Sequence, residues 1–161
     1  MNEQNSTGGS YILFEVAGTS YGVSSRSVQQ VEMIEHITPL PNSTAFVEGV
    51  VFTRGQVIPA MNLRVRFGFE KVPHTTRTRL IVTNQNGRTV GLIVDSAREF
   101  MSIRDEAIQP KPQSLNEMSG RYLKGTVTIG ERIVLIVDLD ELINAGEGRV
   151  PELELQGGGT V

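Results

Sequence analysis

The sequence predicts a mainly β protein made of two small β-barrels packed side by side, with a few short helices. Three observations lead to this fold class. Short apolar runs alternate with glycine-containing turns along most of the 161 residues. The pattern of Phe46–Leu63 returns 76 positions later in Tyr122–Leu139, and an earlier strand pair repeats at a spacing of 69. Because runs of about five twisted strands tend to close and so remove their edges, two such modules predict two barrels.

The first elements are predicted to be two strands, Tyr11–Val16 and Thr19–Val23, joined by a turn at Ala17-Gly18. The pattern of Ser24–Gln30 is ambiguous, and Ser24 or Ser25 can cap a single helical turn there. A strand through Val31–Ile34 then follows. The next stretch contains two prolines and is expected to be a loop or an extended connection.

The clearest pattern is a β-hairpin in the middle of the first half. Two apolar runs, Val50–Phe52 and Val57–Met61, flank the connection Thr53-Arg54-Gly55-Gln56, which contains a glycine. This spacing is typical of a hairpin. Gly49 begins the first run, and its missing side chain predicts a bulge or a close approach of another backbone segment.

The end of this hairpin carries signals for a strand edge and for a short helix. Pro59 has no N–H, so we expect its strand to lie at a sheet edge or Pro59 to lie at a bulge. Asn62 is expected to cap a helix over Leu63–Phe67 that ends at Gly68.

The second half repeats this order. Arg79–Thr83 and Thr89–Asp95 flank Gln85-Asn86-Gly87, and Asn-Gly is a strong signal for a type I′ hairpin turn. Ala97–Ile103 is predicted to be a further strand. A longer connection, roughly residues 104–120, precedes the second copy of the central hairpin. Asp138 then caps a second short helix that ends at Gly146 or Gly148.

Arg54 is the informative difference between the two hairpin copies. Alignment without a gap places Gly49 on Gly125 and Asn62 on Asp138, whereas Arg54 falls on Gly130. A repeat kept for folding should look alike in both copies, so a feature found in one copy is a candidate for function. Arginine is a frequent interface anchor because its planar fork binds carboxylates through two hydrogen bonds. The alternative is an ordinary solvated turn arginine.

The domain organisation is expected to be simple. Residues 1–10 are polar and predict a disordered N-terminal tail, residues 11–144 form the folded region with its two subdomains, and residues 145–161 are glycine-rich and predict a flexible C-terminal tail. A short docking segment at Val150–Leu155 is an alternative for part of this tail.

Composition excludes several classes of function. A net charge of −3 argues against a nucleic-acid partner, since such sites need a basic surface. The absence of cysteine excludes disulfides and thiolate metal sites, and it fits a reducing cytoplasm. No apolar run approaches the length of about 18 residues that a membrane helix needs, so direct membrane insertion is not expected.

No catalytic, metal or cofactor site is expected. His36 and His74 lie beside prolines and lack metal-ligand spacing, and neither a phosphate-binding GxxxxGK[ST] loop nor a GxSxG elbow occurs. The carboxylates that were candidates for acid–base work are better explained as caps, strand ends or solvated positions: Asp95, Glu99, Asp138, Asp140 and Glu141. Eight aromatic residues are expected in the core: Phe14, Tyr21, Phe46, Phe52, Phe67, Phe69, Phe100 and Tyr122. The chemistry that is left is protein binding on an exposed surface.

The sequence resembles the CheW-like family of chemotaxis coupling proteins from about Ser10 to Asn144. Four blocks carry the resemblance in order: FEVAGTSYGV, PLPNSTAFVEGVVFTRGQVIPAMNLRVRFG, RTVGLIVDSAREFMSI and YLKGTVTIGERIVLIVDLDELI. The resemblance implies two five-stranded, SH3-like β-barrels without enzymatic activity. It also implies a scaffold that couples the cytoplasmic tip of chemoreceptors to the regulatory domain of the chemotaxis histidine kinase, a domain of the same family.

The resemblance further implies a receptor-binding groove. Carried over position by position, the groove consists of Val28, Gln30, Val31, Gly49, Arg54 and Gly55. The Arg-Gly pair of the family is intact, but Phe52-Thr53 stands where Asn-Leu is usual, and Gln30 stands where a glutamate is frequent. Both changes are expected to alter receptor preference. Asn62 replaces the usual aspartate at a helix start and caps about as well. No motif identifies the kinase-facing residues.

Three functions are therefore under consideration. The first is a cytoplasmic adaptor in signal transduction, recruited to membrane receptor arrays. The second is a coupling protein of a related pathway such as surface motility, which the identity of the bound kinase would distinguish. The third is a barrel that binds a small ligand, which calorimetry with a panel of metabolites would reveal.

Overall fold

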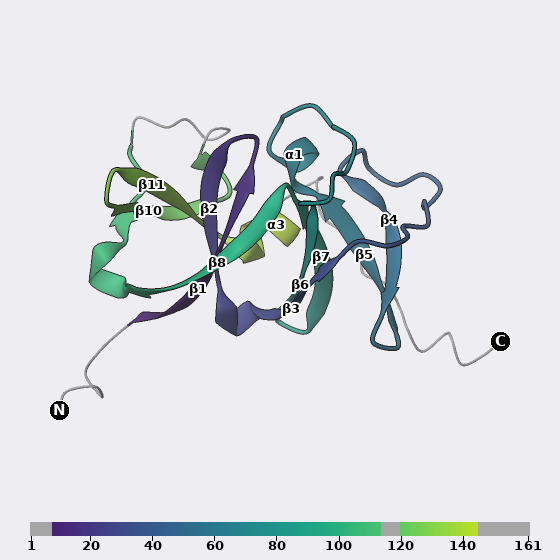
Figure 1. Cartoon of the computed structure of the whole chain (residues 1–161), viewed down its shortest axis with the longest axis horizontal. Helices are drawn as coiled ribbons and strands as arrows, with labels where there is room; N and C mark the ends of the chain where they lie inside the picture. Colours follow the sequence, from purple (N-terminus) through teal and green to yellow (C-terminus); the bar gives the residue numbers. More distant parts are fainter. Residues whose placement is uncertain (1–7, 114–119, 145–161) are drawn as a thin grey trace.

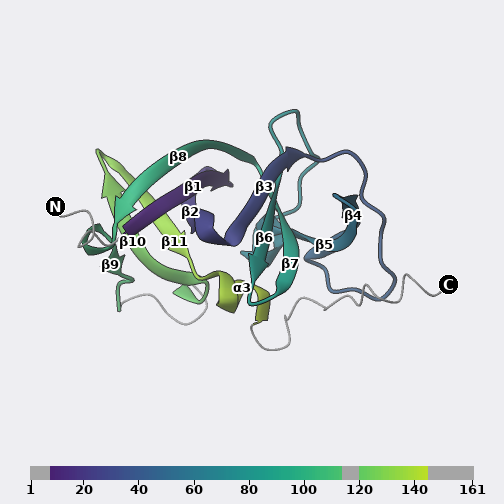
Figure 2. The same cartoon turned by 90° about the horizontal axis from the view of Figure 1, so that it is seen from below.

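The computed structural model describes residues 8–113 and 120–144, and it confirms a mainly β fold with two subdomains. Its eleven strands form two sheets that lie side by side, with helix α3 between them (Figure 1) (Figure 2). Sheet A has the strand order β8-β1-β2-β11-β10-β9, and sheet B has the order β3-β6-β7-β5-β4. The strands are β1 (Gly8–Val16), β2 (Thr19–Ser24), β3 (Val28–Met33), β4 (Val47–Thr53), β5 (Gln56–Asn62), β6 (Arg79–Gln85), β7 (Arg88–Val94), β8 (Ser96–Arg104), β9 (Gln109–Pro110), β10 (Leu123–Ile129) and β11 (Arg132–Val137).

Each sheet takes one hairpin from each half of the sequence repeat. Hairpin β1–β2 joins hairpin β10–β11 through a parallel pairing of β2 with β11, in which Tyr21 lies opposite Leu135. Hairpin β4–β5 joins β6–β7 through a parallel pairing of β5 with β7, in which Met61 lies opposite Leu92. Neither half of the repeat therefore builds a sheet by itself.

Strand alternation divides the apolar side chains among three cores. Leu13 of β1 faces a cluster inside sheet A, whereas its neighbours Ile12 and Phe14 face a larger cluster shared by the two sheets. Leu80 and Val82 of β6 face a cluster inside sheet B, and Ile81 faces the shared cluster. The largest core thus lies between the subdomains, which makes their packing part of folding itself.

Both sheets curl around their own cores. In sheet A, Ile103 of β8 and Val127 of β10 share one cluster although their strands lie far apart in the strand order. In sheet B, Gln30 of β3 donates from Nε2 to Oγ1 of Thr53 in β4 at 2.9 Å, and these are the two edge strands. Thr53 Oγ1 donates in turn to Oε2 of Glu32 at 2.9 Å. This polar cluster brings the two edges of sheet B together.

The predicted helix starts are confirmed. Asn62 Oδ1 accepts from the backbone N–H of Val65 at 3.2 Å and caps α1 (Leu63–Arg66), and Asp138 Oδ1 accepts from the N–H of Glu141 at 3.1 Å and caps α3 (Leu139–Asn144). Single 3₁₀ turns occur at η2 (Ser25–Ser27), which Ser24 caps, and at η3 (Asp105–Ala107).

The close backbone approach predicted at Gly49 is also confirmed, and it occurs in both copies. A Cβ atom on Gly49 would lie 2.1 Å from the carbonyl oxygen of Thr38, and one on Gly125 would lie 2.3 Å from that of Gln109. The register of β4 against β5 shifts between Val47 and Gly49, as a bulge requires.

Asp95 joins the subdomains where the chain passes from β7 to β8. Its Oδ2 accepts from the backbone N–H of Ala17 at 2.8 Å, and it also lies 2.9 Å from Nη2 of Arg64 in α1. Asp95 thereby connects the turn of hairpin β1–β2 to helix α1, which follows strand β5 of sheet B.

Two expectations about the strands differ from the structure. The first strand begins at Gly8, three residues before Tyr11, because β8 continues alongside it and pairs Gly8 with Arg104. The strand of Pro59 is not an edge strand, since β5 lies between β4 and β7. Proline is tolerated there because the pairing with β7 starts only at Ala60.

Three of the eight aromatic residues expected in the core are exposed instead. Phe52 is 74% exposed, Phe100 is 67% exposed and Phe69 is 42% exposed. Phe52 and Phe100 lie on edge strands β4 and β8, where alternation turns every second side chain outward. The two tails, apart from residues 8–10, lie outside the described residues, as does the predicted end of the second helix at Gly146 or Gly148.

Candidate functional site

The turn of hairpin β4–β5 presents Arg54 to solvent at one end of sheet B (Figure 1). Arg54 and Gly55 have φ angles of +52° and +79°, so this is a two-residue turn with both central residues in the left-handed region. Its counterpart Gly130 has φ +62°, which glycine adopts without steric cost. Arg54 forms no hydrogen bond or ion pair with any residue that the structure describes, so its guanidinium is available to a partner.

Gln30 and Val31 lie beside this turn. The Gln30 side chain points inward to Thr53, the residue before Arg54, while Val31 points outward and is 37% exposed. Nε2 of Gln30 also donates to Oε2 of Glu32. A glutamate at this position would instead place two carboxylates together.

Val28 and Gly49 are less exposed than Val31 and Arg54. Val28 is partly buried against the core shared by the two sheets. Gly49 is buried beneath the carbonyl of Thr38. The predicted set thus divides into an exposed group, which comprises Val31 and the Arg54-Gly55 turn with Gln30 behind them, and two more buried positions, Val28 and Gly49; the contact of either group with a receptor stays a prediction.

Exposed apolar side chains surround the Arg54 turn. Phe52 and Val57 flank it on the hairpin, with 74% and 39% exposure, and Met33 on β3 is 60% exposed. A hollow of about 330 Å³ opens among them, with Glu32 and Glu35 also in its lining. Phe52 was expected in the core, but its neighbours Val51 and Thr53 face inward, so alternation along the strand places Phe52 on the surface.

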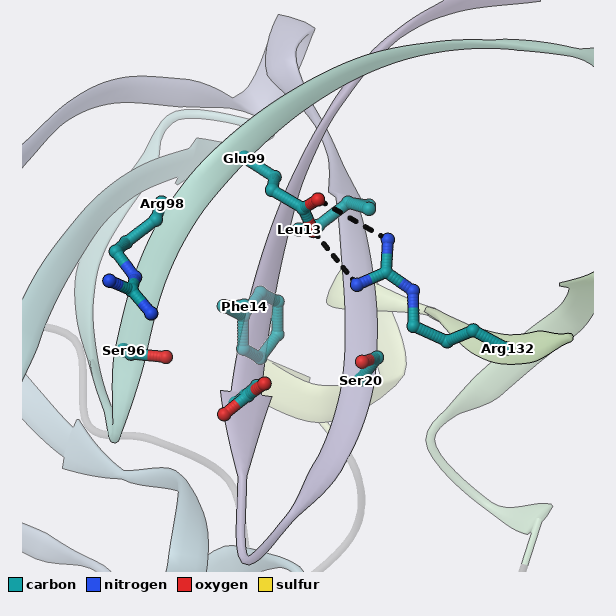
Figure 3. A pocket seen from close by; sticks show the side chains of 8 residues that line it. Leu13, Phe14, Ser20, Ser96, Arg98, Glu99 and Arg132 are labelled. Atoms are coloured by element: carbon teal, nitrogen blue, oxygen red, sulfur yellow. Dashed lines mark hydrogen bonds and ion pairs between the residues drawn. The ribbon is translucent and has the colours of Figure 1, made fainter. Parts of the chain in front are cut away.

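A second hollow, of about 410 Å³, lies in sheet A and is shown in Figure 3. Glu99 of β8 and Arg132 of β11 reach across its opening and form an ion pair with 3.0 Å between Oε1 and Nη1. Ser20 and Arg98 also line it. Glu99 was one of the carboxylates considered for acid–base chemistry, and its ion pair with Arg132 gives it a structural explanation.

No metal site is found among the described residues, since nowhere in residues 8–113 and 120–144 do three His, Asp or Glu side chains gather suitably. His36 is exposed. Nε2 of His74 lies 3.4 Å from Oε2 of Glu48, where it holds the segment between the two halves against β4. None of the helices in these residues is long and apolar enough to cross a membrane.

Comparison with known proteins gives a consistent result. The model of the CheW-like domain family matches residues 10–147. The chain is 31% identical over 140 residues to the chemotaxis protein CheW of Klebsiella aerogenes, covering 87% of this chain and 84% of the relative. It is 29% identical over 136 residues to the probable chemotaxis protein CheW of Rhizobium etli, covering 84% and 88%.

A solved structure shares the fold. The crystal structure of the scaffolding protein TtCheW from Thermoanaerobacter tengcongensis superposes with a TM-score of 0.80 at 27% identity, over 91% of this chain and 98% of that one. The order of strands, the repeated hairpins and the match over residues 10–147 agree with one another, and they show that this chain belongs to the CheW-like domain family.

Proposed function

We propose that this protein is a non-catalytic scaffold that couples chemoreceptors to the chemotaxis histidine kinase. Family membership supports this role, because relatives are named as chemotaxis proteins and a structural neighbour as a scaffolding protein. The observation that carries the receptor side of the proposal is Arg54. It is exposed, unpaired among the described residues, held at a positive φ and replaced by glycine in the other copy of the hairpin.

The receptor would bind as a helix laid against the surface beside this turn. Val31, Phe52 and Val57 offer exposed apolar contacts for one stripe of such a helix. Arg54 would pair with a carboxylate of the receptor or with a carbonyl at a helix end. Gln30 leaves the surrounding polar cluster with one carboxylate fewer than a glutamate would, which would shift receptor preference.

The regulatory domain of the histidine kinase is the second proposed partner, and exposed apolar side chains on sheet A are the proposed contacts for it. Phe100 on β8 and Ile133 on β11 are 67% and 59% exposed. A scaffold needs two such surfaces that can be occupied together. The protein would act in the cytoplasm and would reach the membrane only through the receptor arrays to which it is recruited.

The variant Arg54→Glu tests the receptor contact. We expect binding to receptor-containing membranes to weaken by about tenfold or more, because the charge at the centre of the contact is reversed. Retention of the native kinase on the purified protein and the thermal melt followed by circular dichroism should stay near wild type. Arg98→Glu, which reverses an exposed arginine on sheet A, is the matched control and should bind receptor membranes normally.

Two outcomes would count against the proposal. A large fall in the melting temperature of Arg54→Glu would show that this residue has a structural role. Failure of the wild-type protein to retain any histidine kinase from its native cells would contradict the coupling function, whatever the receptor result.

A further inference from the structure

Arg66, at the end of α1, is a buried cation without a carboxylate partner among the described residues. Its Nε and Nη2 donate to the carbonyl oxygen of Leu142 at 3.1 and 2.7 Å. Its guanidinium also lies over the rings of Phe46 and Tyr122, at 4.1 and 5.0 Å from their centroids. These contacts hold the guanidinium in place but do not neutralise it, and a buried charge without a counter-ion is costly.

The surroundings of Arg66 also disfavour its protonated, charged form. Burial is the largest cause that lowers the pKa of Arg66, and the nearby charge of Arg121 adds to it, while Tyr122 acts in the opposite direction. The guanidinium of Arg121 is exposed and lies 5.9 Å from the ring centroid of Tyr122. Two cations therefore lie against one aromatic ring, and an anion that contacts both would relieve their repulsion.

A hollow of about 380 Å³ opens beside these two arginines, where the two subdomains meet. We call it the junction hollow. Among the residues that the structure describes, its other lining residues are aromatic or apolar and include no carboxylate: Tyr21, Phe67, Gly68, Phe69, Tyr122, Leu123 and Leu135. The rings of Tyr21 and Phe67 stack with centroids 4.9 Å apart, and Phe67 lies 6.0 Å from Tyr122. The lining thus combines a row of contacting aromatic rings with the two arginines, Arg66 and Arg121.

The second copy of the repeat lacks this combination. Arg66 and Phe67 correspond to Leu142 and Ile143, which are fully buried hydrocarbon. Arg121 corresponds to Ala45, and Tyr21 corresponds to Val90. The repeated module can therefore form without two cations and phenol rings at this position, and the same asymmetry that singles out Arg54 singles out the junction hollow.

We propose that the junction hollow binds a small carboxylic acid that has an apolar or aromatic body. The carboxylate would lie between Arg66 and Arg121, where charge-assisted hydrogen bonds to guanidinium groups are available. The body would lie against Tyr21, Phe67 and Tyr122. A volume of about 380 Å³ falls at the small end of ligand sites and suits a body the size of one ring. The site is separate from the Arg54 turn and does not depend on the coupling function proposed above.

The test uses the full-length ¹⁵N-labelled protein and nuclear magnetic resonance. The probe is 3-phenylpropionate, and its uncharged analogue 3-phenylpropionamide is the matched control ligand. We expect saturable shifts of the Arg66 side-chain Nε–Hε signal and of the Phe67 and Arg121 amides, with a dissociation constant of about 1 mM. The amide analogue should bind at least about tenfold more weakly, because it cannot pair with the arginines.

Two variants separate the site from general anion binding. Arg121→Ala removes an exposed charge, so it should leave the melting temperature unchanged and weaken the binding of 3-phenylpropionate by at least about fivefold. Arg98→Ala removes an exposed arginine elsewhere and should bind the probe as the wild type does. Inorganic phosphate, which has no apolar body, should not compete at equal concentration.

The ligand can be a free acid or an acidic side chain of another protein, and one further probe distinguishes these sources. If the capped dipeptide acetyl-Leu-Glu-amide shifts the same signals at lower concentration than 3-phenylpropionate, the hollow serves an acidic peptide segment, and the reverse order indicates a free acid. Absence of saturable shifts up to about 20 mM, equal shifts with the amide analogue, or an unchanged affinity in Arg121→Ala would each overturn the proposal.

Discussion

Arg54 occupies a backbone position that suits other residues better. Its φ of +52° is nearly that of Asn86, at +54°, in the corresponding position of hairpin β6–β7, and asparagine tolerates this conformation because its short side chain bonds locally. For a long side chain the left-handed conformation costs about 1–2 kcal/mol. An arginine kept at such a turn lowers stability, so its presence is better explained by contact with a partner than by folding.

Arg54→Asn should therefore stabilise the protein while it weakens receptor binding. We expect the free energy of unfolding, measured with urea, to rise by about 0.5–1 kcal/mol because the strain is reduced. The matched reverse change, Asn86→Arg, introduces the same strain in the turn of hairpin β6–β7 and should lower the free energy of unfolding by a similar amount. A loss of stability in Arg54→Asn would show that this arginine supports the fold.

The buried phenol of Tyr21 affects how the free energy of unfolding changes at alkaline pH. Burial raises the pKa of Tyr21 above its usual 10.0, so the folded state holds the phenolic proton more tightly than the unfolded chain does. This contribution is fully present below the unfolded pKa of 10.0 and is lost as pH rises from that value through the higher folded pKa, because the unfolded chain ionises first. Tyr21→Phe should accordingly lose less stability than wild type between pH 9.5 and about 11 in urea titrations. Parallel curves for the two proteins would contradict this.

At the scale of elements, each central hairpin forms backbone hydrogen bonds with the connection that precedes it. Gly49 lets the backbone of Thr38 approach β4, and hydrogen bonds of 2.9 and 2.8 Å join Thr38 and Val50 in both directions. In the second copy β9 takes this place against Gly125 in β10. The glycines thus fix where a connecting segment approaches the hairpin, and this approach gives β4 and β10 a further partner.

Gly49→Val tests that approach. The new side chain would meet the carbonyl of Thr38, which lies 2.1 Å from the ideal Cβ position, so the connection must move. We expect the free energy of unfolding to fall by about 2–3 kcal/mol in a urea titration. Gly9→Val in β1, where the Cβ position has no atom within 4 Å, is the control and should be close to neutral. Equal midpoints for the two variants would show that the approach contributes little.

At the scale of the whole molecule, the two subdomains are interleaved. The chain contributes β1–β2 to sheet A, then β3, β4 and β5 to sheet B, then β6–β7 to sheet B, and then returns to sheet A with β8 through β11. The largest apolar cluster lies between the sheets and includes Phe14 from the first half and Leu142 from the second. Neither subdomain can complete its core before both halves of the chain have come together.

Fragments of the chain should show this dependence. A cut between Lys71 and Val72, in an exposed connection, separates the two halves of the repeat. Each fragment alone, residues 1–71 or 72–161, should lack a cooperative melt and dispersed amide signals, and an equimolar mixture should recover both. A cooperative melt of either fragment alone would contradict the dependence of each sheet on both halves. The intact protein at the same concentration is the control.

The sequence alone determined the local structure. Alternation predicted the hairpins, Asn62 and Asp138 predicted the helix starts, and Gly49 predicted a close approach, because each of these signals depends on neighbouring residues. The repeat and the family resemblance predicted two subdomains. The resemblance also placed Arg54 in a binding role, and the structure puts this residue at an exposed turn; its contact with a receptor stays a prediction.

Only the tertiary structure decided how distant segments combine. It paired each hairpin with one from the other half, placed Phe52 and Phe100 on the outside, closed sheet B through Gln30 and Thr53, and buried Arg66 beside an aromatic hollow. The physical reason is that apolar periodicity states which side of a strand is buried but not against which partner. That choice depends on how whole faces from segments about 70 residues apart fit together, which no local pattern encodes.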